Sequence, residues 1–187
     1  MLLRVQLEPP LTERPHRPLN EWIEDAVATH EGALTRYTAR LLGDVDLARD
    51  VVQDAFLKLW EADRGDLEQR LAPWLYTVCR NRALDLLRKE GRMKPMTDGR
   101  LACTRASDPR PDGGENAAGE VLPLLEQLPE RQQEVIRLKF QCGLSYREIG
   151  EVMDLTVTHV GVLIHTGIKS IREKLGVVPS LDPSPPR

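Results

Sequence analysis

A stretch rich in Gly and Pro divides the sequence into two parts, and this division limits the possible folds more than any other feature. Between residues 91 and 119 the 187-residue chain consists mainly of Gly, Pro, Asp, Ala and Arg. Such a segment buries too little apolar surface to offset the entropy lost on ordering it. The sequence therefore predicts two compact units at residues 21–90 and 120–176, joined by a flexible linker at 91–119. Residues 1–20, which contain four prolines, are predicted to form an N-terminal arm, and residues 177–187 a C-terminal tail.

The first unit has the apolar pattern of amphipathic helices, because its apolar residues recur at three- and four-residue spacing. One series covers residues 34–42, after which Gly43 and Asp44 are predicted to end one helix and begin the next. A second series covers residues 47–60. A third begins near Pro73, a residue suited to the first turn of a helix.

The second unit carries clear signals for helix starts. Ser145 and Glu148 fit the S-x-x-E capping box, in which each side chain satisfies a free backbone N–H of the other. A turn is predicted at Asp154, and Thr156 is expected to cap the longer helix that follows. Two helices joined by so short a turn form a helix-turn-helix pattern. No segment suggests a strand, so the predicted fold class is all-α, with two small helical domains.

The net charge of −3 conceals an uneven distribution of charge. Residues 21–69 contain five basic and twelve acidic side chains, whereas residues 70–94 contain seven basic and two acidic ones. The acidic stretch is unsuited to DNA, while the basic stretch is a candidate for binding phosphates. A solvated basic face without a ligand is the alternative interpretation. Two oppositely charged halves suggest two different partners.

Several classes of protein are excluded by what the sequence lacks. No Ser-His-Asp set, metal-ligand cluster, Gly-rich phosphate loop or carboxylate pair stands out, so neither catalysis nor a cofactor or metal is expected. Cys79, Cys103 and Cys142 are far apart and form no C-x-x-C pair, which argues against a disulfide framework and favours a reducing cytoplasm. No apolar run reaches the roughly 18 residues that a membrane-spanning helix needs.

Four stretches of the sequence resemble one known family. Arg36–Trp60 resembles region 2 of the extracytoplasmic-function (ECF) sigma factors within the sigma-70 family, and Pro73–Lys89 is similar to the downstream helices of that region. Leu128–Phe140 and Gly143–Gly150 resemble region 4 of the same family, in the same order and with the same linker position. The resemblance implies a transcription initiation factor that binds core RNA polymerase and directs promoter recognition and DNA melting. It also implies an anti-sigma factor as a further partner.

The resemblance implies that one helix of region 2 contacts the clamp coiled coil of the largest polymerase subunit, and that region 4 contacts the polymerase flap. The expected polymerase-binding residues are Asp50, Val52, Gln53, Asp54, Phe56, Leu59 and Trp60. For Phe56, Leu59 and Trp60 a place in the core is the alternative, since apolar residues at helical spacing usually pack inward.

The next helix matches the positions through which the family reads and melts the −10 promoter element. The expected residues there are Trp74, Thr77, Arg80, Asn81, Arg82, Asp85 and Arg88. An amide can pair with a base edge and guanidinium groups can hold phosphates. Two residues have structural alternatives, because Trp74 could belong to the core and Asp85 could orient Arg82 or Arg88.

Region 4 departs from the family pattern in its recognition helix, where positions that are usually basic are Gly161, Leu163, Thr166 and Ile168. The expected −35 DNA-binding residues are Ser145, Tyr146, Arg147, Thr156, Thr158, His159, Val162, His165 and Lys169. Three interpretations remain open: recognition through hydroxyl, imidazole and methyl contacts; a docking face for the flap or an anti-sigma factor; or loss of DNA binding. The last two would make the chain a polymerase-binding regulator or decoy.

Overall fold

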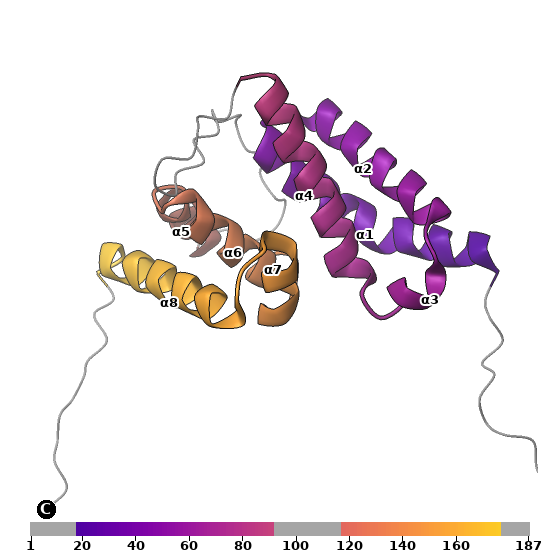
Figure 1. Ribbon diagram of the computed structural model, residues 1–187. Coiled ribbons are helices and arrows are strands. Elements are labelled where there is room, and N and C mark those ends of the chain that lie inside the picture. Colours follow the sequence, from indigo (N-terminus) through magenta and orange to yellow (C-terminus); the bar gives the residue numbers. More distant parts are fainter. Residues whose placement is uncertain (1–17, 92–116, 177–187) are drawn as a thin grey trace, which may run out of the picture.

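The computed structural model describes residues 18–91 and 117–176, and these residues form eight helices and no strand (Figure 1). The predicted all-α fold is confirmed. Nearly all of the predicted N-terminal arm, most of the predicted linker and the whole predicted C-terminal tail lie outside the described residues. No helix in the described ranges is long and apolar enough to cross a membrane.

The first helical unit consists of α1 (Leu19–Leu42), α2 (Val45–Glu61), the single-turn helix α3 (Arg64–Leu67) and α4 (Leu71–Lys89). The predicted boundary between α1 and α2 is confirmed. Gly43 adopts a left-handed conformation with φ of 76° and its N–H donates to the carbonyl of Ala39, while the Asp44 carboxylate accepts from two backbone N–H groups of α2.

Helix α1 begins much earlier than the apolar pattern predicted. Its first turns bury Trp22, Ile23 and Ala26, but the next buried residue is Leu34, two turns further on. That interruption hid the N-terminal half of the helix from an argument based on continuous periodicity. Helices α1, α2 and α4 pack together, with Leu59 among the side chains that close their core.

The second helical unit consists of α5 (Ala117–Leu125), α6 (Glu130–Phe140), α7 (Tyr146–Met153) and α8 (Val157–Lys174). The predicted capping box of Ser145 and Glu148 is confirmed, as is the cap that the Thr156 hydroxyl forms by accepting from the N–H of His159 at 3.2 Å. Asp154 makes the turn between α7 and α8 in a left-handed conformation with φ of 54°. The helix-turn-helix is therefore present.

The two units pack against each other, with α7 lying against α4 (Figure 1). Their buried apolar side chains form one continuous cluster, at whose centre the rings of Tyr37 and Tyr76 meet edge to face with centroids 5.2 Å apart. The chain thus adopts a closed arrangement in which the second helical unit covers part of the surface of the first.

Candidate nucleic-acid interface

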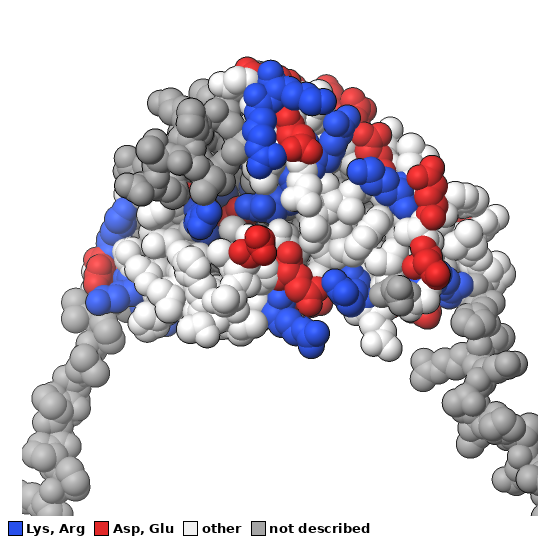
Figure 2. All heavy atoms as spheres, in the orientation of Figure 1, with Lys and Arg blue, Asp and Glu red and all other residues white. Residues whose placement is uncertain are grey.

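The C-terminal half of α4 carries an exposed polar face. Asn81, Asp85 and Arg88 are exposed, and Arg88 Nη1 pairs with Asp85 Oδ1 at 2.7 Å, as one of the two alternatives for Asp85 predicted. Arg82 is half-exposed, and its Nε lies 3.5 Å from Oδ2 of Asp54 on α2. Lys and Arg side chains gather around this end of α4 (Figure 2). Cations at a helix C-terminus also complement the helix dipole, so this end of α4 is a stable basic surface suited to phosphates.

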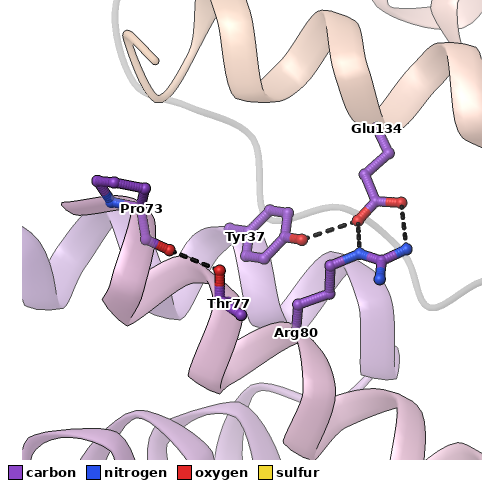
Figure 3. Close-up of polar contacts among 5 residues, drawn as sticks. All are labelled: Tyr37, Pro73, Thr77, Arg80 and Glu134. Atoms are coloured by element: carbon purple, nitrogen blue, oxygen red, sulfur yellow. Dashed lines mark hydrogen bonds and ion pairs between the residues drawn. The ribbon is translucent and has the colours of Figure 1, made fainter. Parts of the chain in front are cut away.

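Arg80 does not belong to that exposed face. Its side chain is 13% exposed, and its Nε donates to Oε1 of Glu134 on α6 at 2.8 Å (Figure 3). Burial alone would lower the pKa of Arg80, but the charge and hydrogen bonds of Glu134 outweigh burial, so the pKa is raised. In this conformation the Arg80 guanidinium faces the second unit and binds a carboxylate there, so its contact with DNA stays a prediction that requires this pair to separate.

Two further residues predicted to read the −10 element have local structural roles. The Thr77 hydroxyl donates to the carbonyl of Pro73 one turn earlier at 2.8 Å (Figure 3). Trp74 is partly buried and packs against the core, in agreement with its structural alternative. Among the α4 residues predicted to bind the −10 element, the side chains that remain available to a nucleic acid are therefore the amide of Asn81 and the guanidinium groups of Arg82 and Arg88.

The predicted polymerase-binding face of α2 is divided between surface and core. Asp50 and Gln53 are exposed, Asp54 is half-exposed, and the Trp60 side chain is 52% exposed. Val52 and Leu59 are 2% and 0% exposed. The prediction for these two residues is wrong, because their side chains fill the space between α1, α2 and α4 and leave no surface for a partner.

Phe56 lies between these extremes, since it is partly buried and packs against the core. Sequence reasoning missed Leu57, which at 66% exposure is the most exposed large apolar residue of the described part. Its three-residue spacing from Trp60 was the available signal, because residues at that spacing share a helix face. Leu57 and Trp60 together form an exposed apolar pair on α2.

The N-terminal part of the outer surface of α8 is exposed and uncharged, whereas Arg172, Glu173 and Lys174 are exposed at its C-terminal end. Thr158, His159, His165 and Lys169 are all exposed, and Val162 is 56% exposed. Lys169 Nζ lies 3.9 Å from Glu173 Oε1, so its charge is partly balanced. In Figure 2 the surface over α8 is mostly free of charged side chains except at its C-terminal end. Sequence reasoning missed Val157, which is 51% exposed at the start of the helix.

Other residues predicted to bind the −35 element support the helix-turn-helix itself. The hydroxyls of Ser145 and Thr156 accept hydrogen bonds from backbone N–H groups at the starts of α7 and α8. The ring of Tyr146 lies 3.7 Å from the position that a Cβ on Gly161 would take, and Lys139 Nζ lies 5.5 Å from its centroid. Arg147 is fully accessible, with a 3.5 Å ion pair to Glu151.

The two glycines of α8 differ in their surroundings. A Cβ on Gly167 would lie 2.6 Å from Cδ1 of Ile136, so a larger residue at this position would require the end of the Ile136 side chain to move. Gly167 is therefore a point of close packing between α8 and α6. This contact brings α8 close to α6. In the described residues there is no group of three His, Cys, Asp or Glu side chains that could hold a metal ion.

Comparison with known proteins agrees with both units. Residues 26–93 match the family Sigma-70 region 2, and residues 119–171 match Sigma-70, region 4. The chain is 30% identical over 166 residues to the ECF RNA polymerase sigma factor SigW of Bacillus subtilis, with 81% of this chain and 87% of SigW covered. It is also 30% identical over 156 residues to the RNA polymerase sigma factor CarQ of Myxococcus xanthus, with 82% and 88% covered.

Two solved structures share the fold. The sigma factor RpoE in its complex with the anti-sigma factor NepR from Bartonella quintana has a TM-score of 0.63 at 24% identity, covering 84% of this chain and 98% of RpoE. CnrH in its complex with the cytosolic domain of CnrY has a TM-score of 0.58 at 24% identity, covering 84% and 90%. With two ordered regions and relatives matched along most of their length, the chain belongs to the ECF group of sigma-70 family RNA polymerase sigma factors.

Proposed function

We propose that this chain is a dissociable initiation subunit that binds core RNA polymerase through α2, opens DNA at the −10 element with α4 and reads the −35 element with α8. The observation that carries this proposal is the presence, on one chain and in family order, of an exposed basic helix end and a helix-turn-helix. The chain works without a cofactor, in the cytoplasm, where the polymerase is found. Binding energy drives promoter melting, and this chain carries out no bond chemistry.

The polymerase-binding surface on α2 consists of the apolar pair Leu57 and Trp60, with Asp50 and Gln53 on the same side of the helix. Exposed apolar side chains with a polar rim are typical of protein-binding sites. The acidic character of residues 21–69 suits a protein partner and disfavours DNA. The clamp coiled coil of the largest polymerase subunit is the partner that this surface fits by family analogy.

The −10 surface is the exposed face of α4. Asn81 can pair with the edge of an unstacked base, while Arg82 and Arg88 can hold the phosphates on either side. Both arginines have carboxylate partners at the surface, Asp54 and Asp85, and exposed pairs of this kind stabilise by at most about 1 kcal/mol. Phosphates can therefore replace these carboxylates at little cost.

The −35 surface is the N-terminal part of α8. The exposed methyl groups of Val157 and Val162 suit contact with thymine methyl groups, and Thr158 and His159 supply hydrogen-bonding groups beside them. Because few cations face outward, sequence-specific contacts contribute a larger share of the affinity here than phosphate contacts do. The free protein is expected to bind double-stranded DNA weakly until the polymerase contributes the rest of the interface.

Reconstitution with core polymerase tests the proposal. We expect the chain to co-elute with core polymerase and to direct promoter-dependent run-off transcription. Asn81→Ala should abolish open-complex formation while polymerase binding persists, and Glu24→Ala, an exposed change on α1, serves as the control. Loss of polymerase binding in Asn81→Ala would contradict this division of roles between α2 and α4.

A second candidate function is that of a polymerase-binding regulator that does not initiate. The nearly uncharged surface of α8 favours it, because phosphate-driven affinity would be small. The same reconstitution separates the two candidates. Co-elution with polymerase but no transcript from any genomic template would support the regulator, and an anti-sigma factor would then compete for the same surfaces.

A further inference from the structure

Glu134 is a carboxylate of region 4 that is buried against region 2. It lies on α6, its side chain is 10% exposed, and its carboxylate accepts hydrogen bonds from two side chains of the first helical unit. A buried carboxylate is strongly destabilising unless its charge is balanced and its oxygens accept hydrogen bonds. The stability of the closed arrangement therefore depends on the hydrogen bonds and the opposite charge that Glu134 receives from its partners across the interface.

Those partners are Tyr37 on α1 and Arg80 on α4, and together they satisfy both carboxylate oxygens. The Tyr37 hydroxyl donates to Oε1 at 2.8 Å, Arg80 Nε donates to the same oxygen at 2.8 Å, and Arg80 Nη2 donates to Oε2 at 3.4 Å (Figure 3). Burial and the charge of Glu134 raise the pKa of Tyr37 well above its usual value, so the hydroxyl keeps its proton. The three residues form one neutral, desolvated cluster, which we call the Glu134 cluster.

Weaker contacts surround the Glu134 cluster on the same interface. Arg40 Nη1 donates to Gln141 Oε1 at 2.7 Å, and Arg70 Nη2 lies 3.4 Å from Glu151 Oε2. Both pairs are exposed, so they contribute little to the free energy of closure. The buried cluster is consequently the polar contact whose loss would most affect closure.

Closure and promoter binding are geometrically incompatible. The −10 and −35 elements are about 25 base pairs apart, which is about 85 Å of duplex at about 3.4 Å per base pair. Helix α8, about 27 Å long, packs directly on α6, and α6 is hydrogen-bonded to α4 in the Glu134 cluster. Helices α4 and α8 cannot therefore occupy both elements until the cluster breaks.

We infer that Glu134 is an intramolecular competitor of promoter DNA: its carboxylate occupies the Arg80 guanidinium, holds region 4 over region 2, and must leave before Arg80 can bind a phosphate. The inference rests on the proposed function of α4 as the −10 surface. A guanidinium fork binds carboxylate and phosphate with the same two-point geometry, so the two ligands exclude each other at Arg80. Opening exposes Arg80 beside Asn81, and the −10 surface is then complete.

Glu134→Gln tests this inference in the full-length chain, with Glu24→Gln as a control that removes the same charge from an exposed site on α1. Closure is measured by the alkylation rate of Cys142, which contacts Tyr76 across the interface, in a Cys103→Ser background. Cys79 is fully buried and does not contribute to the signal. Far-ultraviolet circular dichroism confirms that each variant keeps its helices.

We expect Glu134→Gln to alkylate faster at Cys142 and to bind a single-stranded −10 oligonucleotide at least about fivefold more tightly than the parent, the lower range of measured couplings between sites. Tyr37→Phe, which keeps the charge pair, should lie between the two. Equal alkylation rates and equal affinities in Glu134→Gln and Glu24→Gln would overturn the inference.

The double variant Glu134→Gln with Arg80→Ala separates competition at Arg80 from simple opening. It should alkylate as fast as Glu134→Gln but lose the gain in oligonucleotide affinity. A gain that persists without Arg80 would refute competition at that residue. Run-off transcription by the parent chain is measured in parallel. If the parent gives a transcript but Cys142 of Glu134→Gln is not alkylated faster, only this inference is contradicted. If Cys142 of Glu134→Gln is alkylated faster but the parent gives no transcript, the proposed function is contradicted.

Discussion

The contact between Gly167 of α8 and Ile136 of α6 makes a sharp prediction about what orients the recognition helix. Gly167→Ala places a methyl group 2.6 Å from Ile136 Cδ1 and 3.3 Å from Leu128 Cδ1, both closer than carbon atoms normally approach. Overpacking of this kind costs about 1–3 kcal/mol. Replacing a helical Gly by Ala gains about 1 kcal/mol in helix propensity. We therefore expect Gly167→Ala to lower the free energy of unfolding by about 0–2 kcal/mol.

Ile136→Val removes the Cδ1 atom that causes the closest contact. Alone it should cost about 0.5–1.5 kcal/mol, the usual range for deleting one buried methyl group. In the double variant the alanine methyl group occupies the vacated space, so the two changes should not add. We expect a favourable coupling free energy of about 1–2 kcal/mol.

Urea denaturation of the four chains in this cycle, followed by circular dichroism, measures the coupling. Two results would refute the reasoning. The first is that the changes in unfolding free energy of the two single variants add to that of the double variant within about 0.5 kcal/mol. The second is that Gly167→Ala in the parent raises the free energy of unfolding by about 1 kcal/mol, the full gain in helix propensity. Either would mean that α8 is not held by close contact at Gly167. Under the proposed function of α8 as the −35 surface, promoter binding should follow the same order, because a displaced α8 would meet DNA in a changed orientation.

Three other measurements address separate parts of the structure. Leu57→Ala and Trp60→Ala should each weaken binding to core polymerase by at least about 1 kcal/mol with unfolding free energy nearly unchanged, since both side chains are exposed; affinity measured by fluorescence anisotropy checks this. In the holoenzyme, Lys169→Ala should reduce the slope of log affinity against log salt by about 1, whereas Val162→Ala should weaken binding to the −35 element without changing that slope. Burial raises the pKa of the Cys79 thiol from 9.0 to about 12. Because the unfolded chain loses this proton at lower pH than the folded chain, the free energy of unfolding should fall as the pH rises between these two values, and Cys79→Ala should remove that part of its pH dependence.

Local signals in the sequence predicted the helix boundaries well. The capping box at Ser145, the cap at Thr156 and the boundary at Gly43 each depend on residues within a few positions of one another, and all three are confirmed. Apolar periodicity was less decisive for single side chains. It correctly offered the core as the alternative for Leu59, which the family resemblance had placed at the polymerase interface, but it overlooked the exposed Leu57, because period alone does not fix the width of the buried stripe.

The partnership of Arg80 could not be predicted from any local pattern. Glu134 is 54 residues from Arg80 and 97 residues from Tyr37 along the chain, beyond the stretch predicted to be a linker. Treating the two units as independent made an exposed, DNA-facing Arg80 the natural expectation. Only the packing of α6 against α1 and α4 shows that the residue has a carboxylate partner from the other unit.

The ion pairs of α4 change what its basic composition means for DNA binding. Among its arginines, Arg82 and Arg88 are paired with surface carboxylates, and Arg80 is paired with Glu134 in the interior. A count of charges treats all three as equally available to phosphates, but the free energies required to release them differ. The surface pairs are worth at most about 1 kcal/mol, whereas separating a buried pair leaves both charges uncompensated and costs about 3–5 kcal/mol unless water or a new partner reaches them. The first encounter with promoter DNA should therefore involve Arg82 and Arg88, and Arg80 should join only once region 4 has moved away.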